Sequence, residues 1–229
     1  MSIGKPSRKF VFRPEHLSEA DVQVEMLCGV IMVLVLIGYL KWSFVQDDVE
    51  FKKLMMLVPL GCNAAWGIID GIMYVLVNLR ERGNKSELLS LIKSAKDQAD
   101  AIALVKKEFG FAFLDLLNQD TQKNIYEEIL KGLTNATIVK PKGISKNDLR
   151  LVLKTFLIVF SSGVPIVIPF LFLNDVWLAI RISHIIGLVM LFSIGYWWAI
   201  FASRHRIRSA IGLTILGVFI VGMTELLHG

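Results

Sequence analysis

Cysteine is scarce in this chain, which has only Cys28 and Cys62 among its 229 residues. Both fall inside long apolar runs, so a disulfide framework does not organise the fold. A thiol in such a run can ligate a soft metal, but a buried apolar cysteine is the commoner situation. The sequence also lacks a Walker-type glycine loop, a Gly-x-Ser-x-Gly elbow and a Cys-x-x-Cys pair. We therefore expect neither an enzyme nor a resident cofactor.

Two further features are lacking, a signal peptide and a nucleic-acid-binding patch. The basic residues near the N-terminus are followed by acidic ones before the first apolar run begins, and no clear cleavage site follows. The formal net charge is +5, but the basic residues gather beside the apolar runs and are not interleaved with aromatic residues. We expect no signal peptide and no nucleic-acid partner.

Apolar residues, in contrast, are abundant. They make up 54% of the sequence and gather in near-continuous runs close to both ends. Runs of this length are typical of membrane-spanning helices, and the lipid bilayer is the expected environment. The sequence predicts an all-α polytopic membrane protein with five transmembrane helices, at about residues 25–44, 54–79, 151–173, 176–202 and 209–227.

Residues 80–150 are hydrophilic on average but strongly periodic, which predicts a small helical domain between the second and third spans. Three helices are expected, the first capped by Asn84, at about residues 86–109, 111–117 and 125–133. Carboxylates such as Asp97 and Asp100 could share a cation, but interleaved lysines favour a solvated face of mixed charge. Whether the domain is a spacer or docks a partner stays open at this point.

The basic residues predict one orientation in the membrane. They lie before the first span, in the central domain and in segment 204–208, and all three groups are cytosolic if the N-terminus is cytosolic. The C-terminus then lies on the opposite side. The predicted regions are a cytosolic N-terminal segment, the first two spans, the cytosolic helical domain and the last three spans, at residues 1–24, 25–79, 80–150 and 151–229.

Asp70 is the principal candidate for a functional residue, because a carboxylate at mid-membrane depth costs at least about 2.5 kcal/mol on insertion scales. At 100° per residue it shares one helix face with Asn63, Gly67, Tyr74 and Asn78. Carboxylate and amide oxygens suit Mn²⁺, Fe²⁺, Mg²⁺ or Ca²⁺, and a desolvated carboxylate can also carry a proton. The alternative is a carboxylate that is paired with Arg181 or a backbone amine and serves packing alone.

The third span contains a second set of possible oxygen ligands. Pro165 and Pro169 each lack an amide donor, so the carbonyls around Ser161 and Pro165 lose their helical partners. Within a membrane such carbonyls are tolerated where protein or water satisfies them, and they can also bind a cation. A kinked helix in plain packing explains the prolines equally well.

Three features elsewhere are further candidates. In the fourth span, His184 can ligate a metal or relay a proton, or can be a hydrogen-bonded packing residue. Gly67 and Gly71 are spaced for close helix contact, either within the chain or at a dimer seam. Glu225 and His228, near the end of the last span, are candidates for the mouth of a pathway.

Several short motifs resemble the vacuolar iron transporter (VIT) family. The segment Trp66-Gly-Ile-Ile-Asp-Gly-Ile-Met73 is similar to its Asp-Gly helix, and Val164-Pro-Ile-Val-Ile-Pro-Phe-Leu171 is similar to its proline-rich helix. The segments Ala179-Ile-Arg-Ile-Ser-His184 and Ile194-Gly-Tyr196 resemble the helix that follows. The resemblance implies a dimeric five-span exporter that moves Fe²⁺ or Mn²⁺ out of the cytosol against protons, with a cytosolic three-helix metal-binding domain. The family's intramembrane aspartate corresponds to Asp70.

The resulting hypothesis is a divalent metal transporter driven by proton exchange, with Fe²⁺ or Mn²⁺ as the transported ion and a homodimer as the expected assembly. Six residues are the candidate metal ligands: Asp70, Asn63, Tyr74, Ser161, Pro165 and His184. The alternative is a membrane anchor or assembly protein that transports nothing and whose helical domain docks a partner. In that case flux is absent, and the partner is lost when residues 84–140 are deleted.

Overall fold

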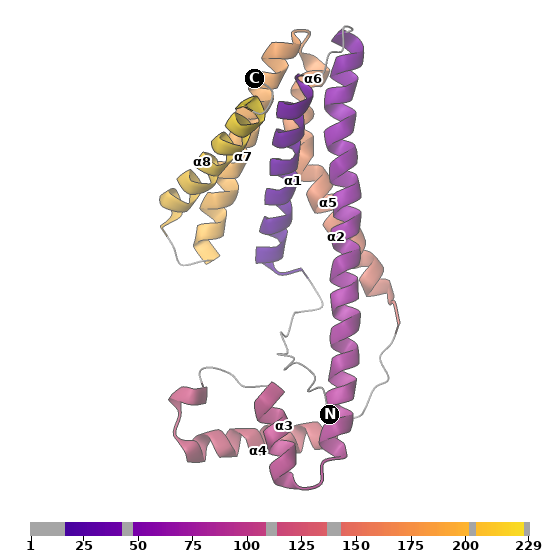
Figure 1. Cartoon of the computed structure of the whole chain (residues 1–229), viewed down its shortest axis with the longest axis vertical. Helices are drawn as coiled ribbons and strands as arrows, with labels where there is room; N and C mark the ends of the chain where they lie inside the picture. Colours follow the sequence, from indigo (N-terminus) through magenta and orange to yellow (C-terminus); the bar gives the residue numbers. More distant parts are fainter. Residues whose placement is uncertain (1–16, 43–47, 109–113, 137–142, 202–204, 227–229) are drawn as a thin grey trace. The chain divides into compact units, whose positions relative to one another are not determined.

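The computed structural model describes residues 17–42, 48–108, 114–136, 143–201 and 205–226, and all the regular secondary structure in them is helical. Figure 1 shows the elements, which are α1 (Glu19–Leu40), α2 (Asp48–Lys93), α3 (Gln98–Glu108), the short 3₁₀ helix η1 (Leu114–Leu116), α4 (Gln119–Asn135), α5 (Lys146–Val167), α6 (Pro169–Phe172), α7 (Val176–Phe201) and α8 (Arg206–Leu226). Five of them, α1, α2, α5, α7 and α8, are long and apolar enough to cross a bilayer. This confirms the all-α class and the number of predicted candidate spans, and indicates an integral membrane protein.

The chain divides into two compact units. The first, called the bundle unit below, contains α1, α2 as far as Val75, and α5 to α8. The second, called the small unit, contains α2 from Leu76 onwards, α3, η1 and α4. Each unit has a hydrophobic core of its own.

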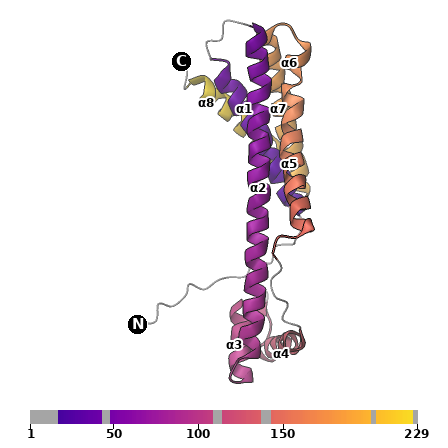
Figure 2. The ribbon, with the colours of Figure 1, turned by 90° about the vertical axis from the view of Figure 1, so that its right-hand side faces the viewer.

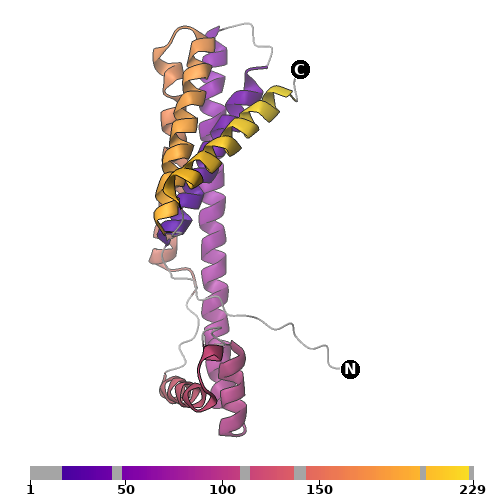
Figure 3. The same ribbon diagram turned by 90° about the vertical axis from the view of Figure 1, so that its left-hand side faces the viewer.

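Helix α1 is the centre of the bundle unit, and it contacts α5, α7 and α8. Four of its apolar residues have no exposed surface: Val30, Val33, Leu34 and Ile37. Figure 3 shows α8 crossing α1 obliquely, with the start of α8 beside the end of α7. A helix that is mostly apolar and packs against three neighbours in this way is typical of a bundle core.

The start of α1 confirms a local prediction. Asp21 N donates to the Ser18 hydroxyl oxygen at 3.2 Å, and Ser18 N donates to the Asp21 carboxylate at 3.0 Å. These two bonds form the capping box that the Ser18-Glu-Ala-Asp21 pattern predicts, and they satisfy two backbone amides at the helix N-terminus.

The predicted end of the second span near residue 79 is wrong as a helix boundary. Helix α2 continues without a break through the charged segment 80–84 to Lys93, a length of 46 residues or about 69 Å. Arginine, glutamate and lysine are good helix formers, so the loss of apolar character at Arg80 ends the apolar run but not the helix. Consequently Asn84 lies inside α2 and does not cap a new helix.

In the small unit, the predicted helix at 86–109 is divided between α2 and α3. The interruption follows Lys93, and the Asp97 carboxylate then accepts a 2.7 Å bond from Asp100 N in the first turn of α3. Asp97 and Asp100 are both exposed, as expected for a solvated face. Of the predicted helix at 111–117, residues 111–113 lie outside the described residues, and the rest forms only η1.

Helix α4 is longer than the predicted 125–133 because Asn118 caps it. The Asn118 side-chain oxygen accepts a 2.8 Å bond from Thr121 N, so the helix starts at Gln119. Its buried face, with Tyr126 and Leu130, joins a core to which α2, α3 and η1 also contribute. The apolar stripe of the small unit is therefore largely buried within the unit itself.

The predicted third span at 151–173 is broken near its end. Helix α5 begins at Lys146 and ends at Val167, and Pro169 begins the four-residue α6. Pro165 stays inside α5. Pro169 is at the first position of α6, where no backbone amide is needed for a hydrogen bond within the helix.

The next helix, α7, is capped by Asp175, which accepts bonds of 2.9 and 3.1 Å from the backbone amides of Trp177 and Leu178.

Candidate functional site

Helices α1 and α2 run antiparallel, and this sets which polar residues meet. Tyr74 bonds to Glu25, whereas Asn63, earlier on α2, bonds to Gly29, which lies later on α1. This register brings Asp70, one turn before Tyr74, to the level of Glu25. Glu25 and Asp70 therefore lie at the same level of the two helices.

Glu25 is the most deeply buried member of this group, with 4% of its surface exposed. Its Oε1 accepts a 2.8 Å bond from the Tyr74 hydroxyl. Its Oε2 is buried and has no donor among the described residues. Two ionised carboxylates at the same level of neighbouring helices would repel each other. Uptake of a proton or of a cation would relieve this repulsion.

The Glu25–Asp70 pair lies nearer to the start of α1 than to its end. Glu25 is six residues after Glu19, which begins α1, so it lies about 9 Å along a helix of about 33 Å. The Glu25–Asp70 pair is therefore about a quarter of the way along α1. The mid-membrane depth expected for Asp70 stays a prediction.

Asn63 shares a face with Asp70 but has a different role in the structure. Its side chain is fully buried, and Nδ2 donates to the carbonyls of Val159 at 3.0 Å and Gly29 at 3.3 Å. One amide thus joins α2 to both α5 and α1. Its Oδ1 is buried without a partner among the described residues. Asn63 lies about 10 Å along α2 from Asp70, so it is not part of the carboxyl pair.

Glycines on the same face let α5 approach α2, as Figure 2 shows for the two helices. A Cβ on Gly67 would lie 2.8 Å from the Cα of Phe156, and a Cβ on Gly71 would lie 2.7 Å from the Cα of Val152. Of the two interpretations of this spacing, close contact within the chain is therefore the one that the structure supports.

The third-span candidates do not join the carboxyl pair. Ser161 is exposed, and its hydroxyl donates to the Ile158 carbonyl at 3.3 Å within α5. Pro165 is half-buried and lies two residues beyond Gly163, which contacts Asn63. The contacts of Asn63, Gly67 and Gly71 place the pair further down α5, toward Val152. The structure therefore separates Ser161 and Pro165 from Asp70.

His184 and Arg181 belong to the other end of the bundle unit. Trp198 of α7 lines a pocket with Gln23, near the start of α1, whereas His184 is 14 residues earlier, about 21 Å along α7. Gly187, one turn after His184, packs against Leu34 in the second half of α1. Arg181 is further away still and is exposed. Asp70 therefore does not pair with Arg181, the pairing that would have given it a packing role alone, because the two residues lie toward opposite ends of the bundle unit.

Within the described residues, no three side chains from histidine, cysteine, aspartate and glutamate come together as a metal-ligand group. Cys28, one turn after Glu25, is near both carboxyl groups and is half-buried. The side chains of Glu225 and His228 lie outside the description. The chemistry that the geometry brings together is two carboxyl groups and one phenol.

Glu25 is the functional candidate that the sequence did not reveal. It lies between Asp21 and the first long apolar run, where an acidic residue is easily taken for part of the polar entry to a span. A signal was present, because Glu25 precedes Gly29 by four residues and so shares its helix face. Only the register of α1 against α2 turns that face toward Asp70.

Comparisons with known proteins add no relative at this point. No model of a known protein family matches the chain, and no curated protein matches it. The site is therefore interpreted from its own residues.

Proposed function

We propose that this protein is a transporter that exchanges a divalent metal cation, Fe²⁺ or Mn²⁺, for protons at the Glu25–Asp70 pair. The observation that carries the proposal is the buried Glu25 carboxyl group, bonded by Tyr74 and adjacent to Asp70. An intramembrane carboxyl pair is expensive to bury, which favours a function beyond packing.

The charge of the pair suits this exchange. With both carboxyl groups ionised, Glu25 and Asp70 carry a charge of −2, which neutralises one divalent cation. Without the cation, repulsion between the two carboxylates is relieved by taking up a proton. Binding of the cation and binding of the proton therefore compete for the same oxygens, which is the chemical basis of exchange.

The ligand type suits the proposed ions. Carboxylate and phenol oxygens are hard ligands, which Mn²⁺, Fe²⁺ and Mg²⁺ accept, and a small divalent cation commonly keeps several waters when it binds to one or two carboxylates. Two carboxyl groups with Tyr74 beside them are then sufficient for a transient site. A transported ion has to leave again, and a sparse ligand set helps its release.

The sequence also supports a direction of metal transport. The positive-inside rule supports a cytosolic N-terminus and a cytosolic small unit, and the resemblance of segment 66–73 to the iron transporter motif implies export from the cytosol. We include the homodimer in the proposal on the same resemblance. Asp70, the aspartate of that motif, is one half of the carboxyl pair.

The test is metal uptake into proteoliposomes that contain the full chain, with an internal dye that reports Mn²⁺ and an imposed pH gradient. We expect Asp70→Asn and Glu25→Gln each to reduce flux at least tenfold. Glu19→Gln is the matched control, because Glu19 is on the same helix but exposed. Flux that is equal in all three variants and the unsubstituted protein would remove the pair from the mechanism.

The second candidate is a membrane anchor or assembly protein without transport activity, whose small unit docks a partner. Two observations favour it: no three-residue metal group occurs among the described residues, and Leu116 of η1 is 85% exposed beside the exposed Leu117. This candidate predicts no flux in the unsubstituted protein. It also predicts a copurifying partner that is lost in Leu116→Ser, while the flux assay stays at background.

A further inference from the structure

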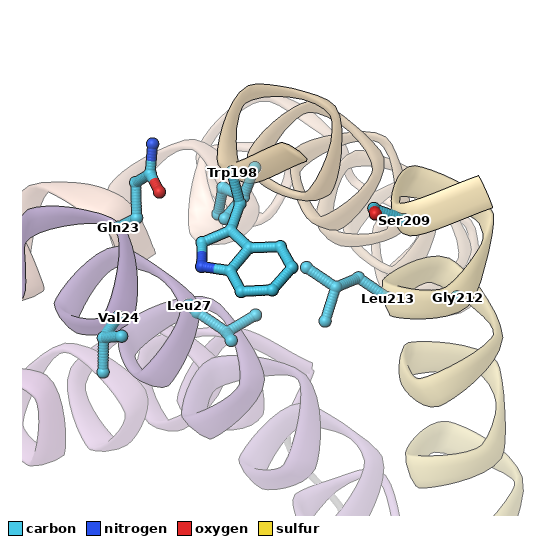
Figure 4. A pocket seen from close by; sticks show the side chains of 8 residues that line it. Gln23, Val24, Leu27, Trp198, Ser209, Gly212 and Leu213 are labelled. Carbon is cyan, nitrogen blue, oxygen red and sulfur yellow. The ribbon is translucent and has the colours of Figure 1, made fainter. Parts of the chain in front are cut away.

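A pocket of about 430 Å³ lies between α1, α7 and α8 in the bundle unit, apart from the carboxyl pair. Figure 4 shows Gln23 and Leu27 of α1 on one side, Ser209, Gly212 and Leu213 of α8 on the other, and the indole ring of Trp198 between them. The wall is almost wholly apolar, and Gln23 and Ser209 are its polar members. A pocket with this lining suits an apolar chain with one polar group near its end.

Gln23 is an unusual residue for such a wall. It is 1% exposed, and neither its Nε2 nor its Oε1 has a hydrogen-bond partner among the described residues. A buried amide without partners is costly. A turn of the Gln23 side chain into the pocket brings its amide to a ligand, and a ligand with an acceptor oxygen then removes part of this cost.

The pocket lies close to the ends of three candidate membrane spans, α1, α7 and α8. Gln23 is about 6 Å from the start of α1, and Ser209 is about 5 Å from the start of α8. Trp198 is three residues before the end of α7, and tryptophan is enriched at the interface between membrane and water. In a phospholipid, the ester carbonyls lie at this interface, and the acyl chains extend from it toward the bilayer centre.

Charge at the same end of the bundle unit favours an anionic lipid. Arg206 and Arg208 are exposed in the first turn of α8, directly before Ser209, and Arg206 lies over the Tyr196 ring. Glu19 and Asp21 begin α1 at this end, but the Asp21 carboxylate is occupied by Ser18. Each basic residue near a membrane surface attracts anionic lipid.

We propose that this pocket binds one anionic phospholipid from the surrounding membrane. An acyl chain fills the space between Leu27, Trp198 and Leu213, an ester carbonyl accepts a bond from the Gln23 amide, and the phosphate lies beside Arg206 and Arg208. The bound lipid completes the packing of α8 against α1 and α7. This inference is independent of the proposed transport activity.

The experiment is native mass spectrometry of the detergent-purified full chain, titrated with phosphatidylglycerol or with phosphatidylcholine of the same acyl chains. We expect one phosphatidylglycerol to be retained per chain and phosphatidylcholine to bind at least tenfold more weakly. Replacing Arg206 and Arg208 together by glutamine should remove the preference for phosphatidylglycerol. Equal binding of the two lipids by the unsubstituted protein would overturn the proposal.

Two glycines on α8 provide a matched pair of variants. A Cβ at Gly212 meets nothing within 4 Å, and the same holds for Gly222, which is not in the pocket. Gly212→Leu should therefore fill the pocket without a clash and weaken phosphatidylglycerol binding at least tenfold, whereas Gly222→Leu should leave it unchanged. Equal binding by the two variants contradicts the assigned position.

Gln23→Leu separates lipid binding from folding. Because it removes a buried amide that has no partner, the lipid-free Tm should be equal to or higher than that of the unsubstituted protein. The rise in Tm on addition of phosphatidylglycerol should be lost. A lipid-induced rise that is unchanged in Gln23→Leu refutes the role of the amide.

Discussion

Gly67 on α2 and Phe156 on α5 are in backbone contact, since a Cβ on Gly67 would lie 2.8 Å from the Phe156 Cα and 3.2 Å from its carbonyl oxygen. Neither atom can move without shifting α5 as a whole. We therefore expect Gly67→Ala to lower the stability of the bundle unit by about 1–3 kcal/mol, as overpacking of a helix contact does.

The measurement is thermal unfolding of the detergent-solubilised protein, and Gly61→Ala is the control. Gly61 is on the same helix but is exposed, and a Cβ there meets nothing within 4 Å. Alanine is the better helix former, so Gly61→Ala should leave Tm equal or slightly higher. Equal Tm values for the two variants would contradict the close contact.

Two substitutions of Asn63 should show how much stability depends on its hydrogen-bond donor and how much on the size of its side chain. Asn63→Asp keeps the shape but turns a carboxylate oxygen toward the Val159 and Gly29 carbonyls, so it should destabilise strongly. Asn63→Leu also loses the two bonds but removes the unpartnered Oδ1. Interhelical hydrogen bonds in membranes average about 0.6 kcal/mol, so the leucine variant should lose far less stability than the aspartate variant. Thermal unfolding compares the two, and the reverse order would refute the interpretation.

Removal of one hydroxyl tests the bond between α1 and α2. Tyr74→Phe deletes the donor to Glu25 Oε1 and should cost about 0.6–1.7 kcal/mol, the range found for hydrogen bonds within membranes. Tyr196→Phe is the control, because it keeps the exposed ring over which Arg206 lies. The Tm of each variant, measured in the same detergent, should fall only for Tyr74→Phe. A loss of the same size in both variants means that the Glu25 bond contributes nothing measurable.

The exposed ion pair on α4 should matter little. Lys131 Nζ lies 2.6 Å from Glu128 Oε1, and this hydrogen bond raises the pKa of the Lys131 amino group above its ordinary value of 10.5. A raised pKa in the folded state gives stability that is complete below the ordinary pKa and is lost as the pH rises through the folded value. No pH dependence from this pair is therefore expected near neutral pH.

Glu128→Gln tests this expectation against a core substitution. The two side chains of the pair are 69% and 72% exposed, so water screens their attraction, and Tm at pH 7 should stay within error. Leu130→Ala, which opens the core of the small unit two residues further along, should lower stability by about 2–5 kcal/mol. A comparable loss in Glu128→Gln would show that the pair stabilises more than its exposure implies.

The parts of the fold that depend on local sequence were predictable. The five apolar runs predicted five long apolar helices, and the Ser18 pattern predicted a capping box that α1 forms. The spacing of Gly67 and Gly71 predicted a close helix contact. Each of these features is set by residues within a few turns of one another.

The carboxyl pair could not be predicted, because it depends on the register between two helices. A shift of α1 by one turn against α2 would bring a different residue to Asp70 in place of Glu25. The unbroken course of α2 past Arg80 was missed for a different reason. The first charged residues after an apolar run show where a membrane span can end. They do not show where the helix ends, because charged residues with high helix propensity continue its backbone hydrogen bonds.

The position of the Glu25–Asp70 pair also fixes how a membrane voltage acts on it. One elementary charge that crosses the whole membrane gains about 2.3 kcal/mol for each 100 mV. If α1 crosses the membrane from end to end, the pair lies about a quarter of the way across, and a charge that reaches it from the nearer face crosses about a quarter of this potential, or roughly 0.6 kcal/mol per 100 mV. The remaining three quarters lie between the pair and the farther face. Voltage should therefore act mainly on the exchange of charge between the pair and that farther side.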